Sequence, residues 1–343
     1  NKQTTATNNI KQKKDKMAKQ PIVAVLGYTG GVGTCLLAAM EKINMKPFAL
    51  VRSKTMRYCS DDKDVPVDFA ALGQRLLEAS KHQKDSIPVI ADVTASMAPQ
   101  EQYQTWLSQG ISVVAANKGI FAGPEATYQS LLTAAAAAEP PCRLLHETTV
   151  GAGLPVLGTL ASLKASSHTI VSVEGILSGT LAFVLGAVAG GKQTLSSAVQ
   201  EAKALGYTEP DPRDDLNGMD VARKAVILAR TAGMTGVELD SMTIESLVPD
   251  KLKDCSVEEF LAGLSEFDDA FAARVAKVES VDGGRLHYAA KVDVAANKVD
   301  VGPLAVEASH PFNNAGPDNM VAITTNFYTR PLVVQGAGAG GDV

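Results

Sequence analysis

The feature that most constrains the fold is an apolar strand that runs directly into a glycine loop and then a helix. Pro21–Leu26 is a continuous apolar run, which is typical of a strand buried on both faces of a sheet. A Gly-x-x-Gly-x-x-Gly loop follows from Gly27 to Gly33, and an apolar-periodic helix extends to about Lys42. Small residues at such a junction let backbone N–H groups approach a pyrophosphate, which the helix N-terminus also attracts. The spacing is not the commoner Gly-x-Gly-x-x-Gly, but its context indicates a dinucleotide-binding loop.

Strands and helices continue to alternate through the first half of the chain. This alternation predicts an α/β fold with a Rossmann-type, doubly wound parallel sheet. We expect this dinucleotide-binding domain to cover residues 17–153, with residues 330–343 returning to it. The further expected strands are 47–51, 87–92, 111–115 and 143–147, and the further expected helices are 67–82, 98–109 and 124–138.

The pattern changes after Gly153, where helices and strands no longer alternate regularly. A chain of 343 residues is long enough for two domains, and we expect residues 154–329 to form a second, α+β domain. Residues 1–16 are polar and lysine-rich, so we expect a disordered extension there. The expected helices are 154–164, 180–189, 194–205, 217–232 and 257–278, and the expected strands are 169–176, 285–293, 297–307 and 331–335.

Composition narrows the range of partners. A net charge of −5 and a pI near 5.6 argue against a nucleic-acid binder that works through a basic face. The longest uncharged run, 175–191, is too short and too glycine-rich for a comfortable membrane span. The four cysteines show no metal-ligand spacing, so we expect free thiols, a reducing compartment and a cytoplasmic location.

The end of the second strand bears on the choice of cofactor. Proteins that prefer NAD place Asp or Glu there, whereas this chain has Arg52-Ser53-Lys54, which suits a 2′-phosphate. We therefore expect NADP(H) to be preferred and NAD(H) to be possible; the alternative is a pair of exposed basic residues without a role. The residues expected to bind the cofactor in this domain are Gly27, Thr29, Gly30, Gly31, Val32, Gly33, Arg52, Ser53 and Thr94.

The most distinctive stretch is Gly206–Lys224. It places Glu209, Asp211, Asp214 and Asp215 in a loop that contains two prolines, which exclude regular helix or strand. Asp220 and Lys224 then share one face of a mostly apolar helix. Acids this dense call for a cation among them, such as a substrate ammonium, a metal ion or a basic side chain. A surface ion pair at a helix N-terminus is the alternative interpretation.

Two further segments are candidates for the site. Lys118, in Ala115-Ala-Asn-Lys, follows a predicted parallel strand at the sheet edge where ligands bind, although a lone lysine there is more often solvated. The segment from Glu147 to Leu154 offers a carboxylate and a glycine-rich turn whose oxygens suit a hard cation such as Na⁺, K⁺ or Ca²⁺. Such a turn can equally just cap the helix that follows.

Together these segments resemble the homoserine dehydrogenases, which interconvert aspartate 4-semialdehyde and homoserine with NAD(P)(H) in threonine and methionine biosynthesis. The resemblance covers Pro21–Val343 and is most specific at 117–118, 147–155, 177–180, 206–224 and 335–341. It implies a homodimer formed through the second domain, acting on a small-molecule substrate. The loop Gly27-Tyr-Thr-Gly30 departs from the family's usual Gly-x-Gly. The chain also ends where the family has a final helix, which suggests truncation or a disordered tail.

The resemblance also implies roles for particular residues. Lys224 would be the catalytic acid/base, and Lys118 would assist near cofactor and substrate. Gly338 and Gly340 would join the cofactor site. A monovalent cation, Na⁺ or K⁺, would bind Glu147 and the carbonyls of Val150, Ala152 and Leu154. The residues implied to hold the amino acid are Glu209, Asp215, Asp220, Tyr207, Gly179 and Thr180.

Two rival functions are consistent with parts of the sequence. An aspartate-semialdehyde dehydrogenase would share the first loop but needs a nucleophilic cysteine, and none of Cys35, Cys59, Cys142 and Cys255 lies in a recognisable site. A catalytically idle NADPH-binding sensor would leave the acidic site empty. The presence of both Lys118 and Lys224 argues against the idle sensor.

Overall fold

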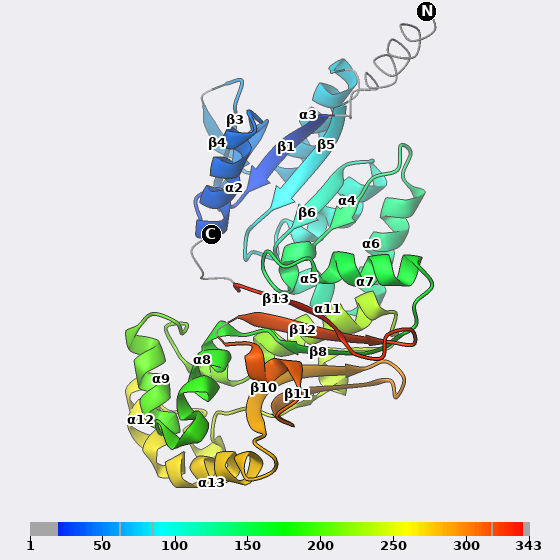
Figure 1. The fold of residues 1–343 in the computed structure, drawn as a ribbon. Coiled ribbons are helices and arrows are strands. Elements are labelled where there is room, and N and C mark those ends of the chain that lie inside the picture. The colour runs from blue at the N-terminus through cyan, green and yellow to red at the C-terminus, as the bar shows by residue number, and fades with distance from the viewer. Residues whose placement is uncertain (1–19, 62, 84–85, 317, 339–343) are drawn as a thin grey trace, which may run out of the picture. The chain divides into compact units, whose positions relative to one another are not determined.

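The computed structural model describes residues 20–61, 63–83, 86–316 and 318–338, which form two compact units (Figure 1). The first unit contains the chain up to Asn117 and Ala126–His146, and the second contains Lys118–Glu125 and the chain from Glu147 onward. The short segment 118–125 thus belongs to the second unit although both its sequence neighbours belong to the first. The expected extension, residues 1–16, lies outside the described residues.

The first unit is built on a seven-stranded sheet in the order β4-β3-β2-β1-β5-β6-β7. Its strands β2, β1, β5, β6 and β7 run parallel in a doubly wound order, so the expected α/β fold is confirmed. The strands are β1 (Gln20–Leu26), β2 (Ala49–Val51), β3 (Thr55–Tyr58), β4 (Asp64–Pro66), β5 (Ser86–Asp92), β6 (Ser112–Ala115) and β7 (Leu144–Leu145). The helices are α2 (Gly31–Lys42), α3 (Phe69–His82), η1 (Gln100–Gln102), α4 (Tyr103–Ser108) and α6 (Glu125–Ala137).

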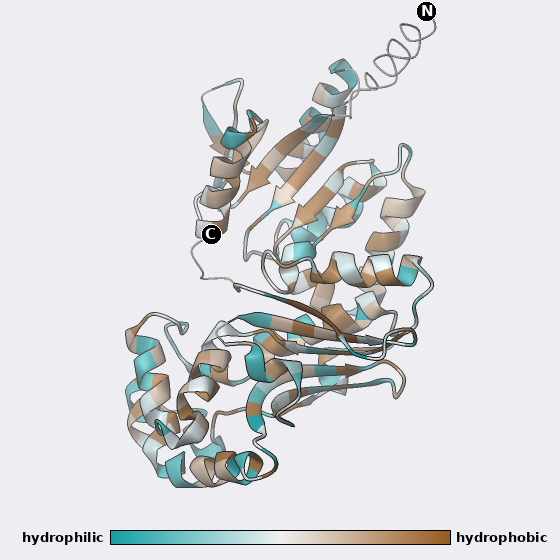
Figure 2. Cartoon of the chain, viewed as in Figure 1, coloured by the Kyte–Doolittle hydropathy of each residue, from teal (hydrophilic) through white to brown (hydrophobic). Residues whose placement is uncertain are grey.

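The middle of this sheet is apolar because its strands are covered on both faces. β1 pairs with β2 on one side and β5 on the other, and its residues from Ile22 to Leu26 are all buried. Figure 2 shows β1 and β5 as predominantly hydrophobic. Burial on both faces explains why β1 is an unbroken apolar run rather than an alternating one.

The sheet is mixed rather than wholly parallel, which corrects one detail of the expectation. β3 pairs antiparallel with β2, and β4 pairs antiparallel with β3, so a hairpin extends the sheet beyond β2. β4 is exposed throughout. Short, exposed edge strands show little of the apolar patterning that makes buried strands predictable.

The second unit is built on a six-stranded sheet in the order β13-β12-β8-β10-β11-β9. All pairs are antiparallel except β11–β9. The strands are β8 (Ile170–Ile176), β9 (Thr243–Ile244), β10 (Arg285–Asp293), β11 (Lys298–Val306), β12 (Asn319–Thr325) and β13 (Leu332–Gly336). The helices are α5 (Gly119–Ala122), η2 (Glu147–Thr149), α7 (Val156–Ala165), α8 (Gly179–Val188), η3 (Ala189–Gly191), α9 (Leu195–Ala204), α10 (Arg213–Leu216), α11 (Met219–Ala232), η4 (Leu239–Ser241), η5 (Asp250–Leu252), α12 (Val257–Gly263), η6 (Leu264–Phe267), α13 (Asp268–Glu279) and η7 (Pro311–Asn314).

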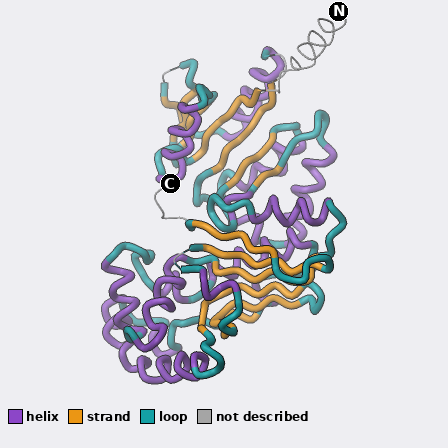
Figure 3. Tube along the Cα trace, viewed as in Figure 1, coloured by secondary structure: helices purple, strands orange, loops and turns teal. Residues whose placement is uncertain are grey.

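Helices cover both faces of this sheet (Figure 3). Ala289 of β10 belongs to an apolar cluster with Phe312, against which Ala182 of α8 packs. The next residue, Tyr288, points to the opposite face, where its hydroxyl approaches the start of α11. Successive residues of β10 thus face α8 on one side of the sheet and α11 on the other. The sheet positions the N-terminal ends of α8 and α11, which carry the candidate substrate residues Gly179, Thr180 and Asp220.

Several elements of the second unit differ from expectation. β12 was not predicted, although Asn319–Ile323 are all buried and Met320–Ile323 is an apolar run. The single helix expected over 257–278 is instead α12, the 3₁₀ turn η6 and α13. Residues 332–336, expected near the first domain, form β13, which pairs with β12. A return of the chain to the first unit beyond that strand remains a prediction.

The start of α11 depends on Gly218. Gly218 has a left-handed backbone with φ of +77°, and a Cβ atom there would lie 1.9 Å from the Tyr288 hydroxyl. That hydroxyl is fixed because it donates to the carbonyl of Glu245 over 2.8 Å. The Asn217 side chain accepts from the Met219 amide and satisfies one of the first helical N–H groups. Only glycine fits this junction without displacing Tyr288.

We predict that Gly218→Ala destabilises the protein more than the matched Gly236→Ala change. Gly236 has a similar φ of +72° but no heavy atom within 4 Å of an added Cβ. Gly236→Ala should therefore cost only the conformational strain of about 1 kcal/mol, and Gly218→Ala should add about 1–3 kcal/mol for the clash. Urea unfolding followed by circular dichroism measures both losses, and equal losses would contradict this account.

Candidate active site

The centre of the candidate site is a carboxylate that contacts two ammonium groups. Asp220, in the first turn of α11, lies 3.1 Å from Lys118 Nζ through one oxygen and 2.8 Å from Lys224 Nζ through the other. Lys224 is one turn further along the same helix, as the four-residue spacing predicts. Lys118 is the residue before α5 and comes from a distant part of the sequence. Sequence reasoning identified all three residues but did not pair Lys118 with Asp220.

Lys224 is the more buried of the two lysines, with 15% of its side chain exposed against 32% for Lys118. Its Nζ also donates to the carbonyl of Leu177 over 2.6 Å, just after β8. Two of the three ammonium hydrogens are thereby directed to Asp220 and Leu177. The third can be given to a ligand that reaches this point.

The two lysines keep Asp220 ionised. Partial burial on its own would raise the pKa of this carboxyl group, but the charges of Lys224 and Lys118, with their hydrogen bonds, outweigh that effect. The pKa of Asp220 is therefore lowered from its ordinary value. Asp220 can hold both ammonium groups in position across the neutral pH range.

A second polar group connects the acidic loop to α8. Asp215 accepts from the backbone amide of Glu209 over 2.8 Å, and its other oxygen lies 3.2 Å from the Thr180 hydroxyl. That hydroxyl also lies 2.5 Å from the carbonyl of Tyr207, so both ends of the loop reach the first turn of α8. Burial, followed by the nearby acids Glu209 and Asp214, raises the pKa of Asp215 despite these hydrogen bonds. A cation that binds here would relieve that cost.

The remaining predicted substrate residues border this group. Gly179 is exposed at the start of α8, and a Cβ added to it would meet no heavy atom within 4 Å. The Tyr207 side chain is 54% exposed, and its ring packs edge-on against Phe183. Glu209 is also exposed. The segment 177–180 contacts both Lys224 and the acidic loop, which brings the predicted substrate residues together.

Asp211 has a structural role within the loop. Both of its oxygens accept from Arg213, whose Nη1 donates in turn to the carbonyls of Leu252, Lys253 and Cys255. These hydrogen bonds, the guanidinium–carboxylate bond above all, lower the pKa of Asp211. The acids of this stretch are therefore not equivalent, since this one is already neutralised within the protein.

A buried arginine, which sequence reasoning missed, positions the segment that carries Lys118. Arg230 of α11 is buried and donates to the carbonyls of Phe121 and Val237, and it contacts Glu238 over 3.3 Å. Glu238 also accepts from the amide of Glu125 over 2.8 Å. The middle and the C-terminal end of segment 118–125 are thus fixed to α11 and the turn beyond it. The only signal in the sequence was an arginine at an apolar position of the helix.

The turn expected to bind a cation caps α7. The two carboxylate oxygens of Glu147 accept from the amides of Leu157 and Gly158, over 2.7 and 2.8 Å. The turn between them contains Gly151 and Ala152, both with positive φ. Val150, Ala152 and Leu154 supply only backbone oxygens, which are hard donors suited to Na⁺ or K⁺. No group of three or more His, Cys, Asp and Glu residues suitable for a metal occurs among the described residues.

The first unit contains a loop shaped for a pyrophosphate. A Cβ at Gly33 would lie 2.2 Å from the carbonyl oxygen of Gly27, so α2 packs closely against the loop. Gly30, the N-cap of α2, provides no side chain to cap the helix, and Gly31 has open space around it. Thr29 and Val32 are also exposed. The amides of the first turn are therefore accessible to a phosphate, and the residues present fit a dinucleotide.

Thr94 lies beside this loop and is held there by buried groups. A Cβ at Gly27 would come within 2.9 Å of Thr94 Cγ2, and the Thr94 amide donates to Asp92 over 2.8 Å. Asp92 is fully buried and accepts from the Tyr103 hydroxyl over 2.6 Å. Burial raises the pKa of both Asp92 and Tyr103. Asp92 and Tyr103 are further site-supporting residues that the sequence did not reveal.

The other predicted cofactor residues lie at the end of β2, after β13 or outside the described residues. Arg52 and Ser53 are exposed at the end of β2. Gly338 follows β13 and packs against Asn319, to which an added Cβ would come within 2.8 Å. Gly340 lies outside the described residues.

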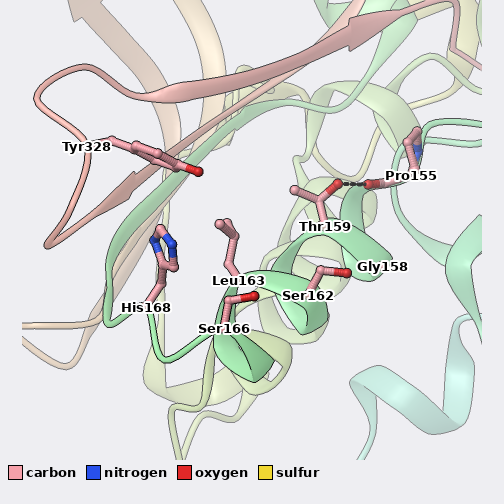
Figure 4. A pocket seen from close by; sticks show the side chains of 8 residues that line it. All are labelled: Pro155, Gly158, Thr159, Ser162, Leu163, Ser166, His168 and Tyr328. Atoms are coloured by element: carbon pink, nitrogen blue, oxygen red, sulfur yellow. Dashed lines mark hydrogen bonds between the residues drawn. The ribbon is translucent and has the colours of Figure 1, made fainter.

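Figure 4 shows a pocket of about 430 Å³ on the second unit. Ser162 of α7 and Ser166, the C-cap of that helix, contribute to it, and the His168 and Tyr328 rings lie 5.1 Å apart on its other side. None of its lining residues belongs to the group around Asp220 and Asp215. It also lacks an acid, a lysine or an arginine, so we assign the chemistry elsewhere.

The cysteines do not provide a nucleophile for an aspartate-semialdehyde dehydrogenase. All four are free, and Cys35 and Cys59 are exposed. Burial raises the pKa of the Cys142 thiol, which lowers its thiolate fraction. The Cys255 thiol donates to the Leu252 carbonyl over 3.4 Å. The Cys142 thiol likewise lies within hydrogen-bond distance of backbone carbonyls, and a carbonyl does not activate a thiol as a base would.

Comparison with known proteins finds a matching family model for each of the two units. A family model described as homoserine dehydrogenase matches residues 155–343, and one described as its NAD binding domain matches residues 29–146. The homoserine dehydrogenase of Schizosaccharomyces pombe is 42% identical over 268 residues, covering 76% of this chain and 70% of that protein.

Solved structures share the fold. A protein of unknown function from Candida auris has a TM-score of 0.87 and 34% identity, with 94% of each chain covered. A hyperthermophilic archaeal homoserine dehydrogenase in complex with NADPH has a TM-score of 0.67, covering 94% of this chain and 93% of that one. At 20% identity this second likeness shows the fold alone. The matching family models and the curated relative show that the chain belongs to the homoserine dehydrogenases, a family of NAD(P)-dependent oxidoreductases.

Proposed function

We propose that this chain catalyses the reversible NAD(P)H-dependent reduction of aspartate 4-semialdehyde to homoserine, a step of threonine and methionine biosynthesis. The observation that carries the proposal is the contact of Asp220 with both Lys118 and Lys224 beside the acidic loop. The family fixes the type of reaction, and these residues suit its substrate. The substrate has an α-ammonium group, an α-carboxylate and an aldehyde, and the site offers acids and ammonium groups together.

Lys224 is the proposed proton donor. The bound cofactor supplies the hydride for the aldehyde carbon, and the aldehyde oxygen then needs a proton. Asp220 and the Leu177 carbonyl hold Lys224 Nζ, which leaves one N–H for that oxygen. Lys118 is proposed to assist as a second cation near the reacting oxygen and the cofactor. In the reverse direction the uncharged Lys224 amine accepts the hydroxyl proton of homoserine.

The acidic loop is proposed to bind the amino-acid end of the substrate. The exposed Glu209 carboxylate and the partly buried Asp215 are the groups proposed to receive the α-ammonium, while Asp220 holds the lysines. The raised pKa of Asp215 supports this assignment, because a bound ammonium ion would favour its charged form. Gly179, Thr180 and Tyr207 border the same group and are proposed to complete the substrate site.

We further propose that NADP(H) is preferred over NAD(H). The support is Arg52 at the end of β2, where a guanidinium suits a 2′-phosphate. Gly27, Thr29, Gly30, Gly31, Val32, Gly33, Ser53 and Thr94 are the other proposed contacts in the first unit, with Gly338 and Gly340 from the chain's end.

The proposed assembly is a homodimer formed through the second unit. Phe327 and Tyr328, at the turn between β12 and β13, are 62% and 46% exposed, and apolar side chains of this size favour burial in an interface. We also propose a cytoplasmic location, which the free cysteines support. No helix in the described part of the chain is long and apolar enough to cross a membrane.

Replacement of Lys224 by Met should remove turnover and leave cofactor binding intact. General acid–base catalysis by a positioned group typically contributes about 10²–10⁴-fold, so we expect kcat to fall at least about 100-fold. The matched control is Arg223→Met, which removes the neighbouring exposed charge on the same helix. Absorbance at 340 nm with homoserine and NADP⁺ gives kcat, and a near-normal kcat in the Lys224 variant would defeat the assignment.

Replacement of Glu209 by Gln should mainly raise the KM for homoserine. Loss of one charge-assisted hydrogen bond corresponds to about tenfold or more in binding. Asp214→Asn removes an equally exposed acid from the same loop and should leave KM close to that of the parent enzyme. If the two variants have the same KM, Glu209 does not contact the substrate.

We propose that a monovalent cation binds Glu147 and the carbonyls of Val150, Ala152 and Leu154. Each carboxylate oxygen of Glu147 accepts one amide and retains a further lone pair, so the donor set suits such an ion. Exchanging KCl or NaCl for choline chloride at constant ionic strength should lower Tm. Binding worth about 1 kcal/mol corresponds to about 1–2 °C for a chain of this length. The difference in Tm between the two salts should vanish in Glu147→Gln and persist in the control Glu139→Gln. A Tm of the parent protein that is the same in both salts would exclude the site.

A further inference from the structure

Arg52, the residue at the end of β2 that is proposed to bind the 2′-phosphate of the cofactor, forms an ion pair with Asp64. Arg52 Nη2 donates to Asp64 over 2.6 Å, and Arg52 Nε donates to the Thr55 hydroxyl over 2.7 Å. The two side chains are 48% and 41% exposed, so both can be reached from solvent. The guanidinium is therefore held beside a carboxylate rather than extended freely.

The β3–β4 hairpin brings Asp64 to this place. A tight turn, closed by the Arg52 amide and the Thr55 carbonyl over 2.9 Å, reverses the chain after β2. β3 then pairs with β4, with Arg57 opposite Asp64. The carboxylate thus reaches the carboxyl end of β2, where NAD-binding proteins place an acid that hydrogen-bonds the adenosine ribose.

We propose that Asp64 is a specificity-determining residue that makes the enzyme use both NADP(H) and NAD(H). Asp64 replaces the acid missing from the end of β2 and accepts from the ribose hydroxyls of NAD(H), whereas Arg52 binds the 2′-phosphate of NADP(H). This inference rests on the proposed function for the identity of the cofactor, and it adds the residue that limits discrimination.

Arg52 has enough hydrogen-bond donors, and Asp64 enough acceptors, to bind either a 2′-phosphate or a ribose. A guanidinium has five N–H donors, of which Arg52 uses two here, and an ionised carboxylate can accept more than the bonds it makes to Arg52 and Thr55. The charges nevertheless favour one ligand over the other. A 2′-phosphate that approaches Arg52 also approaches the negative Asp64, whereas a neutral ribose meets no such repulsion. Asp64 should therefore weaken NADP(H) binding and strengthen NAD(H) binding.

The test measures cofactor dissociation constants without any amino-acid substrate. NADPH and NADH are titrated separately, at about 0.15 M salt, by the change in nicotinamide fluorescence. Asp64→Asn should tighten NADPH about fivefold, the factor expected for removing one like charge about 4 Å away in water, and should weaken NADH. Arg52→Gln should shift the ratio of the two constants in the opposite direction.

Asp61→Asn is the matched control because it removes the same charge from the connection between β3 and β4, and Asp61 is exposed. It should leave the ratio of constants within about twofold of the parent. The same ratio in Asp64→Asn as in Asp61→Asn overturns the proposal, and so does weaker NADPH binding in Asp64→Asn, which would mean that Asp64 orients Arg52 for the phosphate. Circular dichroism verifies that each variant is folded.

The test of Asp64 can fail or succeed independently of the test of the proposed reaction. Cofactor binding with the expected shifts but no turnover of homoserine would reject the proposed activity and leave the role of Asp64 intact. Turnover with unshifted ratios would reject the role of Asp64 alone. Failure of the parent protein to bind either cofactor would overturn both.

Discussion

The contact of Asp220 with two lysines is the interaction on which the candidate chemistry depends. An ammonium group half removed from water is costly unless a countercharge and hydrogen bonds accompany it. Asp220 supplies the countercharge to Lys224 and Lys118 together, and the Leu177 carbonyl supplies a further acceptor to Lys224. The lysines in return keep the pKa of Asp220 low. Asp220 would not stay ionised as readily without the lysines, and the lysines would not be held in position without Asp220.

The acidic loop divides into parts with different roles. Asp211 is neutralised by Arg213, which in turn fixes the chain near Leu252 through its carbonyl contacts. Asp215 has no such cation beside it among the described residues, and partial burial raises its pKa. Acids that are close in sequence are thus separated by function through their hydrogen-bond partners. The local density of charge alone does not distinguish them.

Much of this organisation could be predicted from the sequence, because it is encoded locally. The apolar run of β1 and the glycines after it specify a strand, a loop and a helix within a few residues of one another. Asp220 and Lys224 share a helix face by spacing alone. What escaped prediction has two causes. Lys118 meets Asp220 only in the fold, and the hairpin that carries Asp64 has two short strands, of which β4 is exposed and leaves no apolar pattern. β12 is different, since its apolar run was present and was overlooked.

The network of Arg230, Glu238 and Glu125 has a consequence for how the molecule can be divided. It fastens residues 118–125 to α11, so Lys118 is a component of the second unit although the chain on either side of that segment belongs to the first. The boundary between the two modules is therefore discontinuous along the sequence. A chimera that takes its first unit from a relative would therefore have to keep residues 118–125 of this chain. Without them the second unit would lose Lys118, and Arg230 and Glu238 would lose their contacts with Phe121 and Glu125.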